Sequence, residues 1–443
     1  MIKKILIANR GEIACRIIKT CEKLGIQSVA IYSEADQYSM HVELASESYL
    51  VGGARVNESY LNQDNILNIA KKSGADAIHP GYGFLSEHAG FARRVIEEGM
   101  VFIGPTPEAI EQMGDKVQSR EVMKQANVPV VPGVTLTDIE ENTVIKACRE
   151  IGFPIMVKAA SGGGGIGMQK VDHEDEVMRA VQSVVKKSET FFGSSQIFLE
   201  KYIEKPRHIE AQIAGDDHGN IISLGSRDCS IQRRHQKIIE EAPAPHFSEQ
   251  ANHQLLNEAV KAGEALGYTN VGTVEFLVDD KENIYFLEMN TRLQVEHPVT
   301  EETTGIDLVE WQIRLSEKQM ISTLNRRESK AVHAIEVRIY AEDPKTFFPS
   351  PGTISEWIFP EMEGIRYDFG VRSGTVVTPY YDPMIGKVIA YAGSRGACIE
   401  LMNKCLSNAT VEGIKTNIPM LLKSLEDHRF KEGNVTTHFV QQL

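Results

Sequence analysis

The first hundred residues alternate short apolar runs with segments whose apolar positions recur at helical spacing. The apolar runs predict strands at residues 5–8, 29–32, 77–79 and 101–103. The amphipathic segments predict helices at residues 12–24, 65–73 and 91–98. A series that alternates strands and helices predicts a parallel, doubly wound α/β sheet, which binds ligands beyond the carboxyl ends of its strands.

The pattern changes twice further along the chain. Residues 104–107 read Gly-Pro-Thr-Pro, which is typical of a boundary between domains. Helical, strand-like and glycine-rich segments between residues 142 and 203 predict a small lid. Beyond residue 330 we expect strands at residues 334–341, 353–359, 367–370 and 386–391, followed by a helix at residues 397–406.

Two β-branched and aromatic runs, residues 273–278 and 284–290, are separated by turn residues and predict a β-hairpin. Side chains alternate faces along a strand, so Glu288 and Asn290 share one face, and in one register Glu275 lies opposite Glu288. Like charges directly opposed cost a sheet up to about 1 kcal/mol. A cation between the carboxylates offsets that cost, and oxygen ligands suit Mg²⁺ carrying phosphates. A solvated hairpin edge is the alternative.

A glycine-rich stretch follows a short apolar segment. Residues 154–158 predict a buried strand that ends in Lys158, and five of the six residues at 162–167 are glycine. Glycine loses much backbone entropy on ordering, but its N–H groups can wrap an anion without a Cβ in the way. A lysine just before such a loop supplies a point charge for phosphate. The stretch therefore favours phosphate binding over a flexible linker.

Composition narrows the class of protein. A chain of 443 residues with 42% hydrophobic and 24% charged residues is typical of a globular protein of two or three domains. The net charge of −14 argues against a nucleic-acid partner. No apolar run approaches the roughly 20 residues that span a bilayer, and residues 1–8 lack a signal-peptide pattern. The six cysteines form no metal-site spacing, which favours reduced core thiols in a cytoplasmic protein.

Eight motifs in order, at matching spacing, resemble the biotin carboxylase family of ATP-grasp enzymes. They are ANRGEIACR (8–16), HPGYGFLSE (79–87), KAASGGGGIGM (158–168), RHIEAQ (207–212), RDCSIQRRHQKIIEEAP (227–243), EMNTRLQVEHPVTE (288–301), AIEVRIYAEDP (334–344) and YYDPMIGK (380–387). One such motif can arise by chance, but eight in order cannot. The resemblance spans nearly the whole chain.

The resemblance implies a mixed α/β fold of three domains. These are a Rossmann-like N-terminal domain at residues 1–114, an ATP-grasp domain at 115–329 with a mobile lid at about 131–203, and a C-terminal domain at 330–443. The implied reaction uses ATP and bicarbonate to carboxylate biotin through carboxyphosphate. Bicarbonate is a poor electrophile, so its phosphorylation comes first.

The resemblance also implies roles for individual residues. The implied metal ligands, for Mg²⁺ or Mn²⁺, are Glu275, Glu288 and Asn290. The implied ATP-binding residues are Lys116, Lys158, Gly163, Gly164, Gly165, Glu200, Lys201, Ile203, His208, Gln232 and His235. The implied bicarbonate site comprises Lys237, Arg292, Gln294, Val295 and Glu296. Within it, Arg292 offers a planar, bidentate cation.

The implied chemistry needs a base and a stabiliser of negative charge. Glu296 is the expected general base for bicarbonate, and Arg338 the expected partner of the biotin enolate. Lys237 and Arg292 are expected to act with them in catalysis. Arg338, Tyr82 and Arg16 are expected on the biotin side of the site.

Each assignment has a structural alternative. Arg292 and Arg338 could be ion-paired structural arginines, and His79 is most simply a core or turn histidine. Arg233 and Arg234 are expected to be structural, with Glu240 or Glu241 as partners. The chain also departs from the family at Ile166, where the glycine loop usually carries Lys or Arg.

Two other functions are consistent with part of the pattern. A general ATP-grasp carboxylate–amine ligase would use the same metal hairpin and glycine loop, and a nucleotide sensor would use the fold without catalysis. Arg292, Gln294, Glu296 and Arg338 together favour the carboxylase. Because the sequence contains no Met-Lys-Met biotinylation motif, we expect a separate carrier protein and carboxyltransferase subunits. We expect a homodimer that serves an acetyl-CoA or other acyl-CoA carboxylase, or alternatively a pyruvate carboxylase.

Overall fold

The computed structural model describes the chain except residues 137, 160–167, 193–196, 235, 327 and 330. Its described part divides into two compact units. Unit 1 comprises Met1–Val128, Arg207–Phe276 and Glu288–Leu443, and unit 2 comprises Pro129–Pro206 and Leu277–Leu287. The domain boundaries expected at residues 114/115 and 329/330 stay predictions.

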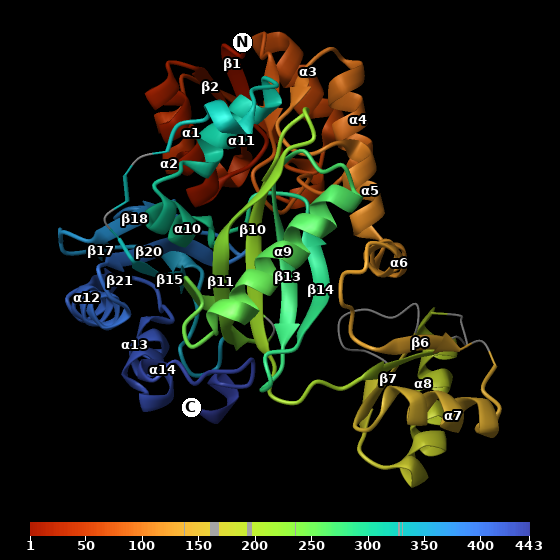
Figure 1. The fold of residues 1–443 in the computed structure, drawn as a ribbon. Helices are drawn as coiled ribbons and strands as arrows, with labels where there is room; N and C mark the ends of the chain where they lie inside the picture. The colour runs from red at the N-terminus through yellow and green to blue at the C-terminus, as the bar shows by residue number, and fades with distance from the viewer. Residues whose placement is uncertain (137, 160–167, 193–196, 235, 327, 330) are drawn as a thin grey trace. The chain divides into compact units, whose positions relative to one another are not determined.

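The N-terminal part of unit 1 is a five-stranded parallel sheet in the order β3-β2-β1-β4-β5 (Figure 1). Its strands are β1 (Lys4–Ile7), β2 (Gln27–Ser33), β3 (Glu47–Gly52), β4 (Ala77–His79) and β5 (Val101–Phe102). Its helices are α1 (Gly11–Leu24), α2 (Met40–Leu44), α3 (Gln63–Ser73), α4 (Ala89–Glu97) and α5 (Pro107–Gly114). The predicted doubly wound arrangement is confirmed, although β3 was not expected from the sequence.

Helix α1 shows how local sequence sets this fold. Ile13, Ile17 and Cys21 lie on one helical face and are buried in the core shared with the sheet. Gly25 ends the helix in the left-handed conformation, with φ of 69°, which glycine adopts without a Cβ penalty. The helix begins at Gly11, shortly after β1 ends at Ile7, and carries Glu12 in its first turn.

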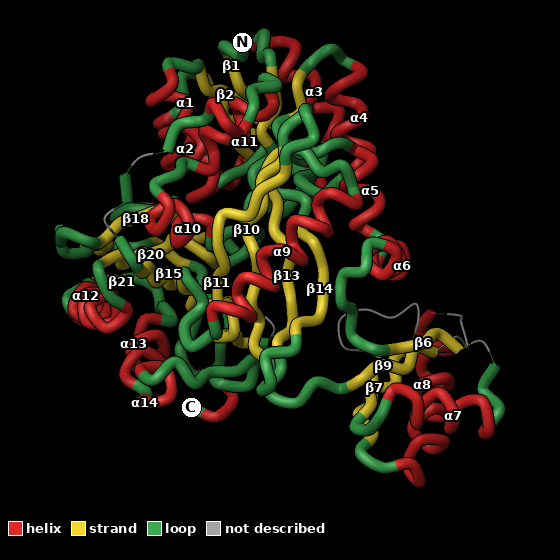
Figure 2. Tube along the Cα trace, in the orientation of Figure 1, coloured by secondary structure: helices red, strands yellow, loops and turns green. Residues whose placement is uncertain are grey.

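A sheet of eight strands forms the rest of the framework, in the order β14-β13-β10-β11-β12-β15-β20-β18 (Figure 2). Its strands are β10 (Arg207–Gly215), β11 (Ile221–Arg233), β12 (Gln236–Ala242), β13 (Asn270–Val278), β14 (Ile284–Asn290), β15 (His333–Tyr340), β18 (Ile365–Phe369) and β20 (Met384–Ala392). The predicted hairpin is confirmed as β13 and β14. The sheet runs without a break from the central region into the C-terminal region, so both regions supply strands to one framework.

Helices cover the faces of this sheet. They are α9 (Glu249–Ala265), which packs on β10 and β11, α10 (His297–Thr304), which packs on β15 and β20, and α11 (Leu308–Ser316). On α9, Gly263 allows close approach, because a Cβ there would meet Ile221 at 3.0 Å and Ile213 at 3.2 Å. The α10 contact buries Val299 with Ala334 and Ile389. This contact fixes the segment just before α10, which carries Glu296.

The C-terminal region adds short strands and helices around its own core. The elements are β16 (Gly352–Thr353), β17 (Glu356–Ile358), β19 (Val376–Val377), α12 (Arg395–Ser407), β21 (Thr410–Glu412), α13 (Ile418–Glu426) and α14 (His428–Lys431). The single strand expected at residues 353–359 was wrong. Strand β16 pairs with β19 and β17 pairs with β21, so the segment contributes to two different small sheets.

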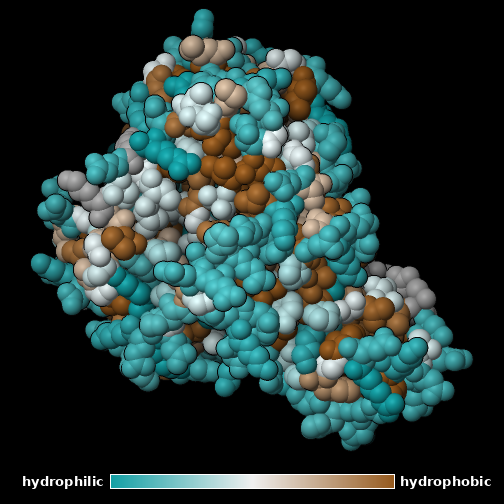
Figure 3. All heavy atoms as spheres, viewed as in Figure 1, coloured by the Kyte–Doolittle hydropathy of each residue, from teal (hydrophilic) through white to brown (hydrophobic). Residues whose placement is uncertain are grey.

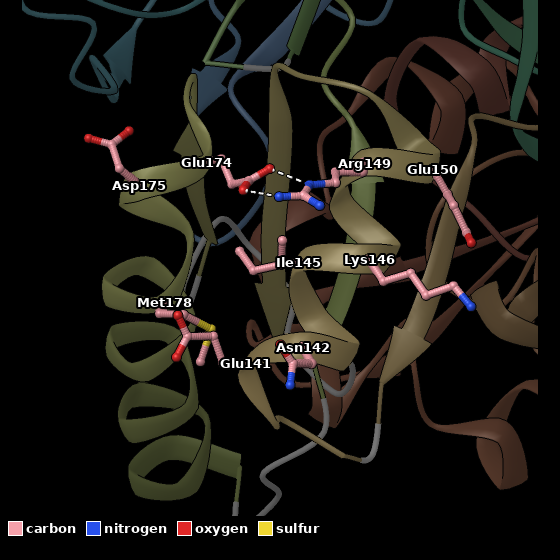
Figure 4. Close-up of a pocket in the computed structure, with 9 residues that line it drawn as sticks. All are labelled: Glu141, Asn142, Ile145, Lys146, Arg149, Glu150, Glu174, Asp175 and Met178. Atoms are coloured by element: carbon pink, nitrogen blue, oxygen red, sulfur yellow. Dashed lines mark hydrogen bonds and ion pairs between the residues drawn. The ribbon is translucent and has the colours of Figure 1, made fainter.

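Unit 2 is a four-stranded sheet in the order β6-β9-β7-β8 packed against two helices. Its elements are β6 (Gly133–Leu136), α7 (Glu141–Ile151), β7 (Ile155–Ala159), β8 (Met168–Val171), α8 (Val177–Phe192) and β9 (Ile197–Lys201). A hollow beside α7 is lined mainly by charged side chains, and Arg149 forms a bidentate pair with Glu174 there (Figure 4). The expected lid falls in this unit, and its movement stays a prediction.

Several smaller expectations can be checked against the fold. All six cysteines are free and buried, as expected for core thiols. His79 is fully buried at the end of β4, where its Nδ1 accepts a hydrogen bond from Gly81 N at 3.0 Å, so it is a core histidine. Within the described residues, no helix is both long and apolar enough to cross a bilayer. On the face seen in Figure 3, hydrophilic side chains cover most of the surface, and hydrophobic ones gather near α11.

The expected partner of Arg233 was wrong. Its guanidinium pairs with Glu342 at 2.7 Å, not with Glu240 or Glu241. Glu241 pairs instead with Arg395 at 2.6 Å. The pairing of β12 with β15, two strands distant in the sequence, determines which side chains meet here. The local sequence does not reveal that pairing.

Candidate active site

A buried cluster of charged side chains lies on the eight-stranded sheet of unit 1. Its centre is Lys237 on β12, whose Nζ lies 2.7 Å from Glu210, 2.8 Å from Glu275 and 2.6 Å from Glu296. The side chain of Lys237 is only 13% exposed. Burial favours the neutral amine, but the three carboxylates outweigh it and hold the pKa of Lys237 well above its ordinary value.

Glu275, on β13, accepts hydrogen bonds from several directions. Its Oε1 is 2.8 Å from Asn290 Nδ2 and 2.7 Å from Gln294 Nε2, and its Oε2 is 2.8 Å from His208 Nε2. Burial raises the pKa of Glu275, but Lys237 and His208 oppose it and hold the pKa well below the ordinary value. The carboxylate is therefore ionised, as a metal ligand must be.

Glu296 lies between two cations just before α10. Its Oε1 accepts from Lys237 at 2.6 Å and its Oε2 from Arg338 at 3.0 Å, and the residue is 1% exposed. Burial alone would raise its pKa, but Lys237 and Arg338 hold the pKa far below its ordinary value. Glu296 is thus a buried carboxylate that stays ionised and is a weak base while both cations are in contact with it.

Arg338, on β15, is held from its other side by Glu240 on β12. Its Nε donates to Glu240 Oε1 at 2.6 Å. Burial lowers the pKa of Arg338, but Glu240 and Glu296 outweigh it and keep the guanidinium charged. The two carboxylates therefore fix the plane of the guanidinium.

Arg292 is the most accessible cation of the site, at 21% side-chain exposure. Its Nε donates to Glu87 at 2.8 Å, and its Nη2 donates to Asn290 Oδ1 at 2.8 Å. Glu87 also accepts from the backbone N of Thr291 at 3.2 Å. Glu87 follows β4 and so connects the N-terminal sheet to the predicted bicarbonate segment.

The structure places the remaining predicted residues of unit 1 in different ways. Gln232 Nε2 lies 3.0 Å from His208 Nδ1, and the other ring nitrogen of His208 faces Glu275. Val295 O accepts from Lys387 Nζ at 2.8 Å, while Glu288 is exposed on β14. The backbone of Lys116 begins helix α6 (Lys116–Gln125), but its side chain lies outside the described part.

Besides Arg338, two residues were expected on the biotin side, and the structure places them differently from each other. The Tyr82 hydroxyl donates a hydrogen bond to Glu12, and the Glu12 carboxylate lies 3.3 Å from Lys387 Nζ. Lys387 donates in turn to Val295 O, so Tyr82 is linked to the site through Glu12 and Lys387. Arg16 belongs to another network, in which it pairs with Glu301 at 2.8 Å and Asp307 at 2.9 Å. The structure does not bring Arg16 into contact with Glu296 or Arg338, and its role in biotin binding stays a prediction.

Unit 2 holds the other predicted nucleotide residues. Lys158 on β7 pairs with Glu200 on the adjacent strand β9, and Lys201 Nζ donates to Phe153 O at 2.5 Å. Ile203 follows β9 and is partly buried. Four predicted positions, Gly163, Gly164, Gly165 and His235, lie outside the described residues.

Sequence reasoning missed five buried or bridging residues that organise the cluster. They are Glu87, Glu210, Arg227, Glu240 and Lys387. Arg227 is 0% exposed and bonds Glu210 at 2.5 Å, Gln212 at 2.8 Å and Thr300 at 3.0 Å. All five lie within the quoted motifs or at a motif end, so motif membership was the available signal.

Family models match almost the whole chain. Residues 1–110 match the biotin carboxylase N-terminal domain, 115–324 match the ATP-binding domain of the carbamoyl-phosphate synthase L chain, and 336–442 match the biotin carboxylase C-terminal domain. The three-domain architecture expected from the motifs is confirmed.

Known proteins similar to this chain agree with the family models. The chain is 54% identical to a biotin carboxylase of Halalkalibacterium halodurans, over 99% of this chain and 97% of the relative. It is 53% identical to biotin carboxylase 2 of Bacillus subtilis, over all of both chains.

A solved structure carries the same likeness. The biotin carboxylase domain dimer of 2-oxoglutarate carboxylase from Hydrogenobacter thermophilus, in complex with MgADP, ADP and bicarbonate, is 44% identical with a TM-score of 0.89. The match covers 100% of this chain and 98% of that one. These findings support an ATP-dependent carboxylase rather than a general ligase or a sensor. With its buried Lys237–Glu296–Arg338 cluster, its three matching domains and full-length relatives above 50% identity, the chain belongs to the biotin carboxylase family.

Proposed function

We propose that this enzyme carboxylates biotin on a separate carrier protein, through carboxyphosphate, as the first half-reaction of an acetyl-CoA or other acyl-CoA carboxylase. The observation that carries the proposal is the Glu296 carboxylate, buried between the cations of Lys237 and Arg338. The full-length likeness to two bacterial biotin carboxylases supports it.

Bicarbonate binding falls to the groups that converge on the segment before α10. Arg292 presents a guanidinium that is anchored by Glu87 and partly exposed, which suits bidentate contact with a planar anion. Lys237 adds a second cation, and Gln294 and the Val295 backbone add polar contacts. The bicarbonate bound to the Hydrogenobacter relative supports a site for this anion in the family.

Glu296 takes the proton of bicarbonate in this mechanism. Lys237 and Arg338 depress its basicity in the free enzyme, because both cations stabilise the carboxylate. An anion bound beside Lys237 offsets part of that positive charge and raises the pKa of Glu296. Substrate binding therefore increases the strength of the base at the time it is needed.

Carboxyphosphate breaks down to CO₂ and phosphate, and the phosphate takes the ureido proton of biotin. Arg338 stabilises the enolate that forms, which then attacks the CO₂. Its guanidinium is held in a fixed plane by Glu240 at 2.6 Å and Glu296 at 3.0 Å. A preorganised donor costs no reorganisation when charge develops, and a single such donor contributes about 10² to 10³ in rate. Tyr82 would border the same site, and Arg16 would act from the network behind it.

The donor chemistry of the hairpin fits Mg²⁺ or Mn²⁺. Glu275 is held ionised by its neighbours, and Glu288 is an exposed carboxylate on the adjoining strand. Asn290 lies against Glu275 at 2.8 Å and offers an amide oxygen that Arg292 holds in this structure. We assign these three residues to the metal, which would neutralise charge on the phosphates of ATP when bound.

Nucleotide-binding residues are proposed for each unit by itself. In unit 2, we assign Lys158 and the glycine segment to the phosphates, and Glu200, Lys201 and Ile203 to the base. In unit 1, we assign Lys116, His208, Gln232 and His235 to nucleotide binding. The MgADP bound to the Hydrogenobacter relative supports nucleotide use.

The acceptor of the carboxyl group is decided by a transferase partner. The likeness to both stand-alone biotin carboxylases and a 2-oxoglutarate carboxylase domain leaves the sequence compatible with more than one acceptor. We propose the acyl-CoA route because two relatives above 50% identity are biotin carboxylases of matching length. The dimer of the Hydrogenobacter domain supports a homodimer for this chain.

The test is transfer of radiolabelled bicarbonate to the biotinylated proteins of the same cell. The purified enzyme, Mg-ATP and labelled bicarbonate are incubated with each isolated carrier, and then with candidate acyl-CoAs and keto acids after addition of the transferase. Labelling of a free carrier followed by transfer to an acyl-CoA supports the proposal. A label that passes only to a keto acid, or no labelled carrier, contradicts it.

A further inference from the structure

Glu336 is a fully buried carboxyl group with no assigned role. It lies on β15, two residues before Arg338, and both side chains are on the same face of the sheet. Its partner in register on β12 is Glu240, and directly opposed residues have Cβ atoms about 4.5–5.5 Å apart. Two glutamates therefore face each other directly behind the proposed biotin site.

The hydrogen bonding of this glutamate pair is incomplete. Both oxygens of Glu336 and Oε2 of Glu240 are buried, and none of them accepts a hydrogen bond from the described part of the chain. Only Oε1 of Glu240 is bonded, to Arg338 at 2.6 Å. An ionised carboxylate buried without a donor is strongly disfavoured.

The cations nearby are committed to other groups. Arg338 is shared by Glu240 and Glu296, and Lys387 lies 2.8 Å from Val295 O and 3.3 Å from Glu12. Other titratable side chains on the elements packed here include Glu12 and Arg16 of α1, Tyr82, Lys237 and Glu241 of β12, His297 and Glu301 of α10, His333 and Tyr340 of β15, Arg366 and Asp368 of β18 and Tyr391 of β20. In the described part of the chain none of them hydrogen-bonds to Glu336, although Lys387, Arg338 and Tyr82 interact with it electrostatically.

Two carboxyl groups that share a buried site cannot both ionise cheaply, so one of them keeps a proton. Burial raises the pKa of Glu336 well above its ordinary value, and Glu240 raises it further against the opposing effect of Lys387. Burial also raises the pKa of Glu240, to about 7, with Arg338 opposing the shift. Since Glu240 alone has a cation in contact, Glu336 is the member that holds the proton.

We propose that Glu336 is a positioning residue for biotin carboxylation: as a neutral carboxylic acid it donates a hydrogen bond to Glu240 and so fixes the carboxylate that holds Arg338. The inference rests on the proposed role of Arg338 at the biotin enolate. Glu240 then accepts from Arg338 through one oxygen and from Glu336 through the other. The arrangement sets the plane of the guanidinium on the side away from Glu296.

Three variants separate this role from simple packing. Glu336→Gln keeps the shape and an N–H donor, whereas Glu336→Met keeps the length and removes the donor. Biotin-dependent phosphate release at pH 8 should fall about tenfold to a hundredfold in kcat/KM for biotin in Glu336→Met, because misplacing a catalytic group by about 1 Å costs up to 10²-fold. Glu336→Gln should restore most of that activity. Glu258→Gln, at a buried glutamate of α9, is the matched control.

The pH dependence of stability, measured by thermal or urea unfolding, is a second readout. A role of Glu336 in packing alone would not affect it. The folded protein holds a proton that the unfolded chain releases above the ordinary glutamate pKa of 4.5. The contribution of Glu336 to stability should therefore fall as the pH rises from 4.5 toward its raised pKa in the folded protein, by at most a factor of about ten in the folding constant per pH unit. Glu336→Gln should lack that one-proton slope, while Glu258→Gln should retain it. This comparison still decides the matter if Glu336→Met does not fold.

Arg338→Gln, measured in parallel, distinguishes two kinds of failure. Full activity in Arg338→Gln overturns the proposed role of Arg338 itself. Reduced activity in Arg338→Gln combined with wild-type activity in Glu336→Met overturns the positioning role of Glu336. The role is also overturned if Glu336→Gln shows the same pH slope of stability as the wild type. Restored activity in Glu336→Gln together with the missing slope supports it.

Discussion

Replacement of Glu296 by Gln tests the proposed general base with little change in shape. In the wild type, the two oxygens of Glu296 accept from Lys237 at 2.6 Å and from Arg338 at 3.0 Å. A carboxamide has one oxygen and one NH₂ group, so it can accept from only one of the two cations. It also cannot take up a proton near neutral pH.

The expected loss follows from the role of the group. A positioned general base contributes about 10² to 10⁴ in rate, which corresponds to about 3–5 kcal/mol of barrier. We expect bicarbonate-dependent turnover to fall within that range in Glu296→Gln and at least as far in Glu296→Ala. ATP affinity should be nearly unchanged, since Glu296 accepts hydrogen bonds from Lys237, Arg338 and Cys229, and none of these three is a proposed ATP-binding residue.

The assay is phosphate release from Mg-ATP with bicarbonate and biotin, with nucleotide binding measured separately by calorimetry. Glu241→Gln is the matched control, because Glu241 is also buried and paired with two basic side chains, Arg395 and His333, and its side chain points to the opposite face of β12 from Glu240. Wild-type turnover in Glu296→Gln would remove Glu296 as the base. An equal loss in Glu241→Gln would show that the effect is structural.

Three further outcomes are expected. Lys237→Met leaves three buried carboxylates without their shared cation, so it should lower the free energy of unfolding, measured in urea, by about 3–5 kcal/mol and should also reduce turnover. Unchanged stability would contradict the ion pairs described for Lys237. Chelation with EDTA should abolish phosphate release, and Mg²⁺ or Mn²⁺ should restore it, whereas Glu288→Lys should raise the metal concentration required; normal metal dependence in that variant would exclude Glu288. Burial lowers the pKa of His79 to about 3, so this histidine should reduce the stability of the wild type by about 1.4 kcal/mol for each pH unit below 6.5. Acid unfolding of His79→Asn should lack that contribution.

The sequence predicted most local elements because their causes are local. The hairpin of β13 and β14 follows from its β-branched runs and its turn, and α1 follows from the spacing of its apolar residues and from Gly25. The strand expected at residues 353–359 was wrong because pairing with β19 and β21, both distant in sequence, splits it in two. Strand β3 was missed because only Val51 is buried in it and because its sequence starts with the polar residues Glu47 and Ser48 and ends in Gly52.

The candidate site also has residues that the sequence predicted and residues that it did not. Lys237, Glu275, Asn290, Gln294 and Glu296 were expected together, and the structure brings them into one hydrogen-bonded cluster. The residues that hold this cluster in place could not be named from local sequence. Their contacts cross the fold.

Two of those contacts illustrate the distance involved. Glu87 and Arg292 are 205 residues apart, and Lys387 and Val295 are 92 apart. Only the sheet order that places β12, β15 and β20 side by side makes the second contact available. Glu240 and Glu336 face each other for the same reason.

The central claim is tested most directly by phosphate release from Mg-ATP in the presence of bicarbonate, with and without free biotin. The account predicts release that requires bicarbonate and is strongly stimulated by biotin, with loss of that stimulation in Glu296→Gln. Hydrolysis that is indifferent to biotin, or that is switched on by an unrelated amine, would contradict it.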